Sequence, residues 1–272
     1  MAVAARIVEL IDIDELKELA DLFARIWGRG EEAAIGSDVL KALAHSGNYV
    51  AGARHEGGEL IGGLVGWFGG VPPRHLHMHS HILGVAAGRD AKGLGFELKQ
   101  HQRRWCLERG VGVMEWTTDP LVRRNVYFNL GKLGARATEY LVNFYGQMDD
   151  GINAGEESDR LLIRWDLASP RAERAASGHR QGPGEDWLVG RGAFPILRVG
   201  TSGEPVAAAS TDAGELLCEL PEDIVEMRRT DPPLARRWRL AVRSAITSAL
   251  AHGFRITGAT RSGWYVLGPQ AE

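Results

Sequence analysis

Two periodicities of apolar residues follow one another along the first 110 or so residues of the chain. Period-two alternation of apolar and polar positions is typical of strands, and apolar residues three and four positions apart are typical of amphipathic helices. The predicted elements follow the order of a mixed α/β domain. The strands are predicted at residues 7–10, 47–53, 60–68 and 77–85, and the helices at residues 16–27, 37–43 and 94–105.

The predicted strand at residues 60–68 is rich in glycine, with Gly62, Gly63 and Gly66 in its interior. Glycine weakens a strand, so it often marks a place where a ligand or another backbone comes close. A thin strand beneath bulky neighbouring side chains explains the same glycines. The sequence leaves both explanations open.

The C-terminal part of the chain has its own set of elements. Residues 169–186 are rich in Pro, Ala, Gly, Arg and Glu and poor in large apolar residues, which is typical of an exposed linker. Before them, we expect the last strand segment of the first domain at residues 143–146 and a further strand at 161–167. The predicted organisation is a domain at residues 1–168, the linker, and a smaller α+β portion at residues 187–272. In that portion, strands are predicted at residues 205–209, 215–220, 254–259 and 264–267, and a helix at Asp231-Pro232-Pro233 and beyond.

Composition excludes several classes of protein. The 272 residues carry a formal net charge of −3, which argues against nucleic acid as the main partner because phosphate binding needs a basic face. Cys106 and Cys218 are too few for a disulfide framework and are expected to be buried, as in a reducing compartment. No apolar run approaches the roughly 20 residues of a membrane helix, and residues 1–6 lack the pattern of a signal peptide. We therefore expect a cytoplasmic protein with no membrane partner.

The turn between the strand at 77–85 and the helix at 94–105 has the most specific chemistry. Gly93 and Gly95 lie where the helix begins, and glycine lets a backbone approach an anion without a Cβ in the way. The first N–H groups of a helix have no partner within the helix and favour a phosphate. Lys92 and Arg89 add positive charge there. A tight turn without a ligand explains the same glycines, so the pattern alone leaves both uses open.

This stretch resembles motif A of the GNAT superfamily, the acetyl-CoA-dependent N-acyltransferases, whose loop has the pattern Gln/Arg-x-x-Gly-x-Gly/Ala. Gly93-Leu94-Gly95 matches the second half of that pattern, whereas Asp90 stands at the Gln/Arg position and Arg89 one residue earlier. Further on, residues 112–121 resemble the next strand of the family and residues 124–135 its next helix. The likeness covers roughly residues 5–150.

The resemblance implies an α/β fold class with a GNAT-like mixed, mostly antiparallel central sheet flanked by helices, to which the smaller α+β C-terminal portion is added. Within that portion, a helix followed by His252-Gly253-Phe254 and a strand echoes the first domain. It resembles a half-copy of the same fold. Because it lacks a glycine-rich loop, we assign it no cofactor.

The resemblance also implies the cofactor-binding residues. The backbone around residues 91–95 holds the pyrophosphate of acetyl-CoA or another short acyl-CoA, and the Val85 N–H polarises the thioester carbonyl. In the next helix, Asn125 and Asn129 either contact CoA or cap the helix. The residues assigned to the cofactor are Val85, Arg89, Ala91, Lys92, Gly93, Leu94, Gly95, Asn125 and Asn129.

The catalytic candidates are His81, His79 and Tyr127. Strand alternation places both histidines on one face, with Val85 at its end, and histidine titrates near the working pH of a general base. A core histidine bonded to a backbone carbonyl is the alternative. Leu130 stands where the family has the tyrosine that protonates the thiolate, so Tyr127, one turn earlier, is the better choice of acid or is a packed aromatic residue.

Two further groups have open roles. His75 and His77 fall on the same face as the other histidines, and His-x-His on a strand can supply zinc ligands. Because no Cys or carboxylate lies nearby in sequence, we assign no metal. One of Glu115, Thr117 and Asp119 faces the amine, or Asp119 pairs with Arg123 or Arg124. The Arg123-Arg124 pair either meets an anionic group, such as the CoA 3′-phosphate, or is solvated.

The sequence therefore predicts an enzyme that moves an acetyl or other short acyl group from acyl-CoA to a small-molecule amine, with an amino acid as one option. Direct attack in a ternary complex is expected because Cys106 lies within a helix and no Cys–His pair is evident. The alternative is a catalytically inactive CoA-binding or interaction protein on the same fold. The C-terminal portion either completes the acceptor pocket or forms a homodimer face.

Overall fold

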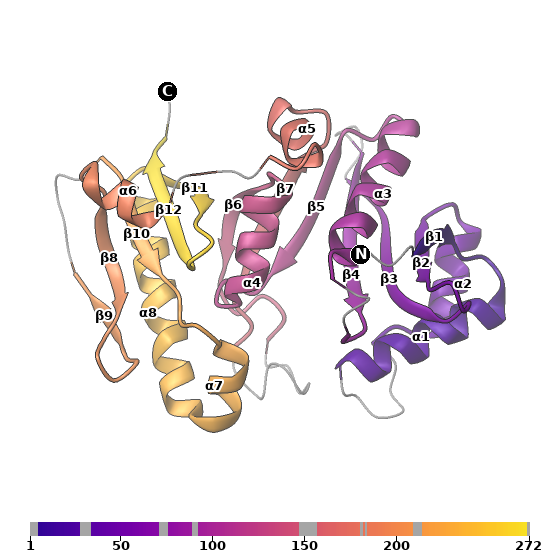
Figure 1. Cartoon of the computed structure of the whole chain (residues 1–272), viewed down its shortest axis with the longest axis horizontal. Helices are drawn as coiled ribbons and strands as arrows, with labels where there is room; N and C mark the ends of the chain where they lie inside the picture. Colours follow the sequence, from indigo (N-terminus) through magenta and orange to yellow (C-terminus); the bar gives the residue numbers. More distant parts are fainter. Residues whose placement is uncertain are drawn as a thin grey trace. The chain divides into compact units, whose positions relative to one another are not determined.

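The chain forms two compact units, and each is described by itself (Figure 1). The first comprises Met1–Trp116 with Asp166–Ala168, and the second comprises Thr117–Trp165 with Ser169–Glu272. The computed structural model describes residues 5–27, 34–70, 76–88, 92–146, 157–179, 182, 184–208 and 214–270.

The sheet of the first unit has its strands in the order β1-β2-β3-β4-β5. Neighbouring strands are antiparallel from β1 to β4, and β5 runs parallel to β4. This mixed, mostly antiparallel sheet confirms the fold class that the sequence predicts. The strands are β1 (Arg6–Glu9), β2 (Tyr49–Arg54), β3 (Leu60–Gly69), β4 (His77–Val85) and β5 (Val113–Thr118), the last two residues of which belong to the second unit.

Helices cover both faces of this sheet, and the glycines of β3 allow them to lie close. A Cβ at Gly62 would lie 3.1 Å from Leu94 of one helix, and a Cβ at Gly63 would lie 3.2 Å from Phe23 of another. The glycine-rich strand is therefore a thin strand beneath bulky neighbours. The helices are α1 (Ile13–Trp27) and α2 (Ser37–His45), which share a hydrophobic core on one face, and α3 (Leu94–Glu108) on the other.

The second unit contains a β-hairpin and a second sheet. The hairpin strands β6 and β7 are antiparallel, and the second sheet has the order β11-β12-β10-β8-β9. In that sheet β8 and β10 are parallel, and the other neighbours are antiparallel. The elements are α4 (Arg123–Val126), the π-helix η2 (Tyr127–Lys132), β6 (Arg136–Leu141), β7 (Arg160–Asp166), α5 (Pro170–Ala176), α6 (Glu185–Gly190), β8 (Phe194–Val199), β9 (Pro205–Ala207), β10 (Leu216–Glu219), α7 (Ile224–Thr230), α8 (Pro232–Ala251), β11 (Phe254–Ala259) and β12 (Trp264–Pro269).

Two parts of the chain share one strand order. β5 is followed by α4 and then by β6 and β7, with the sheet order β5-β7-β6. β10 is followed by α7 and α8 and then by β11 and β12, with the order β10-β12-β11. In each part the last strand lies between the other two. This shared order supports the proposal that the C-terminal portion is a half-copy of the first fold.

The structure differs from the sequence prediction around β6. Residues 143–146, expected as a strand, form a turn in which Asn143 has a φ of 47°, so that prediction is wrong. The strand is β6, six residues whose mostly exposed side chains give no clear alternation. Within the segment predicted as a linker, α5 is capped by Ser169 and buries Ala172 and Ala175. Small buried alanines are easily missed because they add little hydrophobicity to a polar stretch.

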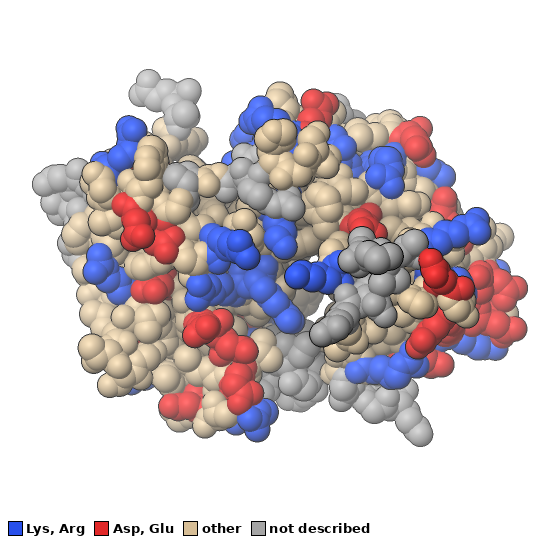
Figure 2. Space-filling view, viewed as in Figure 1, with Lys and Arg blue, Asp and Glu red and all other residues tan. Residues whose placement is uncertain are grey.

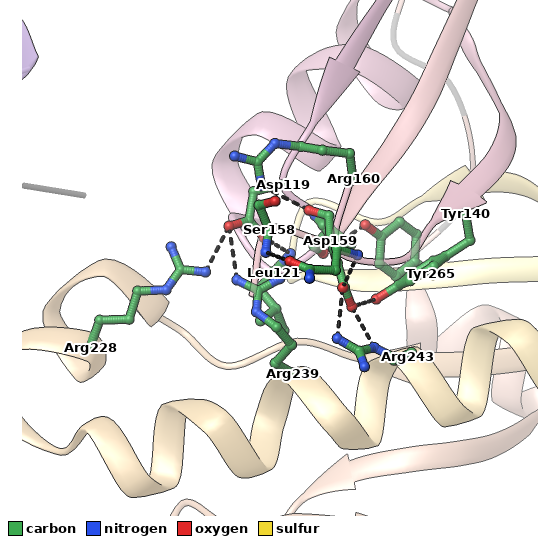
Figure 3. A network of polar contacts seen from close by, with 12 residues as sticks. Asp119, Leu121, Tyr140, Ser158, Asp159, Arg160, Arg228, Arg239, Arg243 and Tyr265 are labelled. Atoms are coloured by element: carbon green, nitrogen blue, oxygen red, sulfur yellow. Dashed lines mark hydrogen bonds and ion pairs between the residues drawn. The ribbon is translucent and has the colours of Figure 1, made fainter. Parts of the chain in front are cut away.

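Buried arginines pair with buried carboxylates in the second unit (Figure 3). Asp119 accepts hydrogen bonds from Arg228 of α7 at 2.6 Å, from Arg239 of α8 at 3.2 Å and from the Leu121 N–H at 2.9 Å. Burial by itself raises the pKa of Asp119, but Arg239 and Arg228 outweigh it and hold that pKa below its usual value. Asp119 therefore fixes α7 and α8 rather than pairing with Arg123 or Arg124.

A second buried carboxylate, Asp159, lies just before β7. It accepts hydrogen bonds from the Tyr140 hydroxyl at 2.8 Å, from the Asn143 N–H at 3.0 Å and from the Arg243 guanidinium at 2.7 and 2.8 Å (Figure 3). Lys and Arg side chains also gather on the surface over α4 and β12 (Figure 2). One of them, Arg123, lies against Gly263 directly before β12. Arginine thus joins helices to strands throughout this unit.

Cys106 and Cys218 are both buried and free, as the sequence predicts. None of the helices in the described ranges has the length and apolar character needed to cross a membrane.

Candidate functional site

Helix α3 begins at Gly93, whose backbone is left-handed with a φ of 94°. The Gly93 carbonyl accepts the N–H groups of Phe96 at 2.9 Å and Glu97 at 3.2 Å. The N–H groups of Leu94 and Gly95 are therefore those that the helix itself leaves without a partner. Among the described residues, no side chain caps this helix. The start of α3 thus presents backbone donors to an anion.

The surroundings of this helix start are open. An added Cβ at Gly93 would meet no described atom within 4 Å, and one at Gly95 would make ordinary contacts with Leu83 and Val85 at 3.8 and 3.9 Å. Glycine at position 93 is therefore required by the left-handed backbone rather than by packing. Lys92 is exposed beside it. Arg89 and Ala91, also predicted to bind the cofactor, lie outside the described residues.

Strand β4 contains a β-bulge at His81. Val65 of β3 pairs with Ile82, and Gly66 pairs with Ser80, so His81 has no partner in this ladder. A bulge adds one residue to a strand and therefore shifts the alternation of side chains beyond it. This shift decides which residues of β4 share a face.

The histidines and Val85 lie on opposite faces of β4, so the prediction that they share one is wrong. Ile82, beyond the bulge, packs against the α1 core, whereas Val85 reaches toward Gly95 of α3. Before the bulge, His79 is on the α1 side because it pairs with Trp67, two residues from Val65 of the α1 core. Simple alternation fails here because a bulge arises from pairing between strands.

The Val85 N–H points away from β3. The next residue, Ala86, donates its N–H to the Ile61 carbonyl of the β3 edge at 2.9 Å, and N–H directions alternate along an antiparallel ladder. On its other side β4 pairs with β5 only at Met78 and His79 in the described register. Val85 therefore directs its N–H to the β5 side of the strand, well beyond the end of that ladder. This is the direction that the predicted oxyanion role requires.

The two catalytic histidines form an aromatic cluster with Trp67. The Trp67 ring centroid lies 5.0 Å from that of His79 and 4.5 Å from that of His81, and the two imidazoles are 5.6 Å apart. Burial lowers the pKa of His79 to about 4, and the neighbouring His81 and His77 lower it further. Burial also lowers the pKa of His81. Both imidazoles are therefore neutral at physiological pH.

Glu115 extends this cluster to β5. It pairs directly with His79 in the β4–β5 ladder, and its carboxylate lies 3.7 Å from the His77 Nε2. The histidine face thus carries an indole, three imidazoles and a carboxylate. In the parts of the chain that the structure describes, no group of three or more His, Cys, Asp or Glu side chains is arranged to hold a metal ion. His75 lies outside those parts.

Lys99 of α3 is a buried cation that the sequence prediction missed. Its Nζ donates to the Ser80 hydroxyl at 2.8 Å and lies 3.7 Å from the centre of the Trp116 ring. Burial lowers the pKa of Lys99 to about 7. The Ser80 hydroxyl in turn donates to Gln102 at 2.8 Å. Lys99 therefore bridges β4 and β5 beside the bulge, at the end of their ladder.

A sequence signal for this buried lysine exists beside the main apolar stripe of α3. Gly95, Lys99, Gln102 and Cys106 recur at helical spacing, next to the stripe of large apolar residues. A polar residue between a glycine and a cysteine on such a stripe is expected to be buried. Reading only the large apolar residues assigns Lys99 to the solvent side.

The remaining predicted residues belong to the second unit. Tyr127 and Asn129 lie in the π-helix, with Asn129 buried and the Tyr127 ring 2.5 Å from where a Cβ at Gly131 would be. Asn125 is exposed in α4. A π-helical turn widens the helix by about one residue per turn and shifts the faces that follow it, so an alignment that assumes α-helical spacing misplaces them. The roles of these three residues stay predictions.

Comparisons with known proteins find similar structures and no similar sequences. No protein-family model and no curated protein matches the chain. Arabidopsis thaliana Naa50 in complex with a bisubstrate analogue has 15% identity and a TM-score of 0.48, over 60% of this chain and 99% of that chain. Chaetomium thermophilum Naa20 in complex with a bisubstrate analogue has 14% identity and a TM-score of 0.49, over 63% of this chain and 89% of the other.

An aminoglycoside 6′-N-acetyltransferase from Enterococcus faecium has 16% identity and a TM-score of 0.45, over 60% of this chain and 98% of that chain. These values are too low to transfer an activity or a substrate. The chemistry of this chain therefore has to be argued from its own residues. The features that carry it are the uncapped start of α3, the bulge in β4 and the histidine face.

Proposed function

We propose that the protein is an N-acyltransferase that moves an acetyl or other short acyl group from acyl-CoA to a small-molecule amine. The observation that carries this proposal is the step from β4 to α3. A strand with an outward-directed N–H at Val85 leads to a helix that begins at an uncapped, left-handed glycine. Backbone donors at a helix start favour a pyrophosphate, and an N–H on the strand favours a developing oxyanion.

Direct attack of the amine on the thioester fits the cysteines. Burial raises the pKa of the Cys106 thiol to about 12, so it carries almost no thiolate at physiological pH. Cys218 is buried and its thiol pKa is raised as well. An acyl-enzyme on either cysteine is therefore disfavoured. In the direct reaction, the amine nitrogen bonds to the carbonyl carbon, the C–S bond breaks, and the nitrogen loses a proton to a base.

The rival function is a CoA-binding protein without catalysis. The lowered pKa of His79, which makes it a weak base, favours this rival. Asp90 at the family's Gln/Arg position also favours it. Micromolar binding of acetyl-CoA without release of free thiol in the presence of any amine tested would establish the rival.

Calorimetric titration with acetyl-CoA and succinyl-CoA tests the acyl-CoA site. Gly93→Val is expected to abolish binding, because a β-branched residue disfavours a φ of 94° and moves the first N–H groups of α3. Gly110→Val is the matched control, since Gly110 at the other end of α3 has a φ of 74° and similarly open surroundings. Equal loss of binding in both variants, or no binding by the parent protein, would contradict the proposal.

A further inference from the structure

Three side chains form a row across β3, β4 and β5 on the face opposite α3. Trp67 pairs directly with His79, and His79 pairs directly with Glu115. Directly paired residues share a face of the sheet, so the row places an indole, an imidazole and a carboxylate next to one another. His81 stays on this face because of the bulge and extends the aromatic part of the row.

The aromatic part of the row offers a surface for another planar ring. Trp67 and His79 are half-buried, and His81 is exposed. The two imidazole planes are tilted by 38° and 42° from the indole plane, so the three rings form a shallow aromatic surface rather than a closed stack. Aromatic rings favour offset-stacked and edge-to-face contacts with one another. A flat aromatic group of a ligand satisfies both.

The imidazoles of the row are weak bases, and this restricts the amine. Burial and the neighbouring imidazoles hold the pKa of His79 at about 4, so His79 does not remove a proton from an aliphatic ammonium group. An aromatic amine is uncharged at neutral pH because its lone pair is delocalised into the ring. Its nitrogen attacks without prior deprotonation. The attack makes the nitrogen positively charged and acidic, and a weak base then suffices to take the proton.

We propose that this row is the acceptor site and that it takes a primary aromatic amine, whose ring packs on Trp67 and His81 while its nitrogen lies at His79. This inference rests on the proposed function. The C–N bond forms as the thioester C–S bond breaks, and His79 accepts the proton lost by the nitrogen. The leaving thiolate takes up that proton, so the products are an anilide and free CoA thiol.

A panel of three amines separates ring stacking from basicity. Aniline has a ring and an uncharged nitrogen, benzylamine has a ring and an ammonium group, and cyclohexylamine has neither a planar ring nor an uncharged nitrogen. With acetyl-CoA as donor, thiol release is expected to give a kcat/KM for aniline about tenfold or more above those for the other two. A higher kcat/KM for cyclohexylamine or benzylamine than for aniline would overturn the inference.

Trp67→Leu tests the stacking surface directly. It is expected to raise the KM for aniline about tenfold while the acetyl-CoA Kd stays unchanged, because only the acceptor contact is removed. Trp187→Leu is the matched control, since Trp187 is 53% exposed on α6 of the second unit. An unchanged KM for aniline in Trp67→Leu would overturn the inference.

Binding of aniline without acyl-CoA reports on the row apart from catalysis. The His79 and His81 imidazole protons are expected to shift in NMR spectra on addition of aniline, and Trp67→Leu is expected to remove most of the shift. Shifts without acyl transfer would overturn the proposed function and keep the aromatic-amine site. Acyl transfer to aliphatic amines without these shifts would overturn the aromatic-amine site and keep the proposed function.

Discussion

Helices α3 and α8 each follow a strand of a mixed sheet, but they begin in opposite ways. α3 begins at Gly93, without a side-chain cap among the described residues. α8 begins at Asp231, whose carboxylate accepts the Leu234 N–H at 3.1 Å, and its first residues are prolines, which have no N–H. The short helix α7 before it is capped in the same way by Asp223. A carboxylate at a helix start occupies the donors and repels an anion, so only α3 is open to a phosphate.

The buried cations of the two helices differ in the same sense. Lys99 of α3 donates to a neutral serine hydroxyl, whereas Arg239 and Arg243 of α8 bind buried carboxylates. A buried cation beside neutral partners is unfavourable for stability, and a buried charge pair holds its elements in place. The comparison indicates that α3 is arranged for a ligand and α8 for rigidity.

The largest expected effect is on the stability of the second unit. Arg228→Met leaves the buried Asp119 carboxylate with one fewer cation and is expected to lower the free energy of unfolding by about 3–5 kcal/mol. Arg229→Met, at the next position of α7, removes only an exposed pair with Glu226 and is expected to leave stability nearly unchanged. Denaturant titration measures both. Similar losses in the two variants would show that burial does not distinguish these pairs.

A second prediction converts the start of α3 into that of α8. Gly93→Asp places a carboxylate at the open helix start and is expected to weaken acetyl-CoA binding about 100-fold, by occupying the first N–H groups and repelling the pyrophosphate. Gly110→Asp introduces the same charge at the far end of α3 and is expected to bind as the parent does. Calorimetry checks the pair, and parent-like binding by Gly93→Asp would refute the anion site.

A third prediction concerns Lys99 and pH. The folded protein releases this proton near pH 7, whereas the unfolded chain holds it to about pH 10.4, so this group makes stability rise with pH between these values. Below pH 7 the full cost of the buried charge remains. Lys99→Met is therefore expected to be more stable than the parent at pH 6, on the order of 2 kcal/mol after loss of the Ser80 hydrogen bond.

That advantage is expected to shrink as the pH approaches 10, and melting curves at pH 6, 8 and 9.5 follow it. Ser80→Ala is the companion variant, because it removes the hydrogen bond and leaves the charge. It is expected to be less stable than the parent at pH 6. A constant difference between Lys99→Met and the parent at all three pH values would show that Lys99 does not titrate in this range.

The smallest expected effect is at the start of α7. Asp223→Ala removes the acceptor for the N–H groups of Val225 and Glu226, both at 3.0 Å, and is expected to cost about 1 kcal/mol of stability. It is not expected to create acetyl-CoA binding, because α7 and α8 have no glycine-rich loop before them. Binding gained by this variant would show that an uncapped helix start alone suffices.

The shape of the first unit could be predicted from local sequence patterns. Each of its strands and helices is a continuous run with its own periodicity, and the glycine at the start of α3 is a local requirement of the backbone. Conformational preferences of this kind act within a few residues, so they are legible in the chain. The order of the mixed sheet then followed from the resemblance carried by Gly93-Leu94-Gly95 and its neighbours.

The face of β4 and the charges were decided by the tertiary structure. The bulge at His81 depends on how β4 pairs with β3, and it moved Val85 to the face opposite the histidines. The burial of Lys99 depends on Ser80 and Trp116, and the pairing of Asp119 depends on Arg228 and Arg239, which lie more than 100 residues away in the chain. Periodicity carries no information about such contacts, because burial and charge pairing are set by residues that become neighbours only on folding.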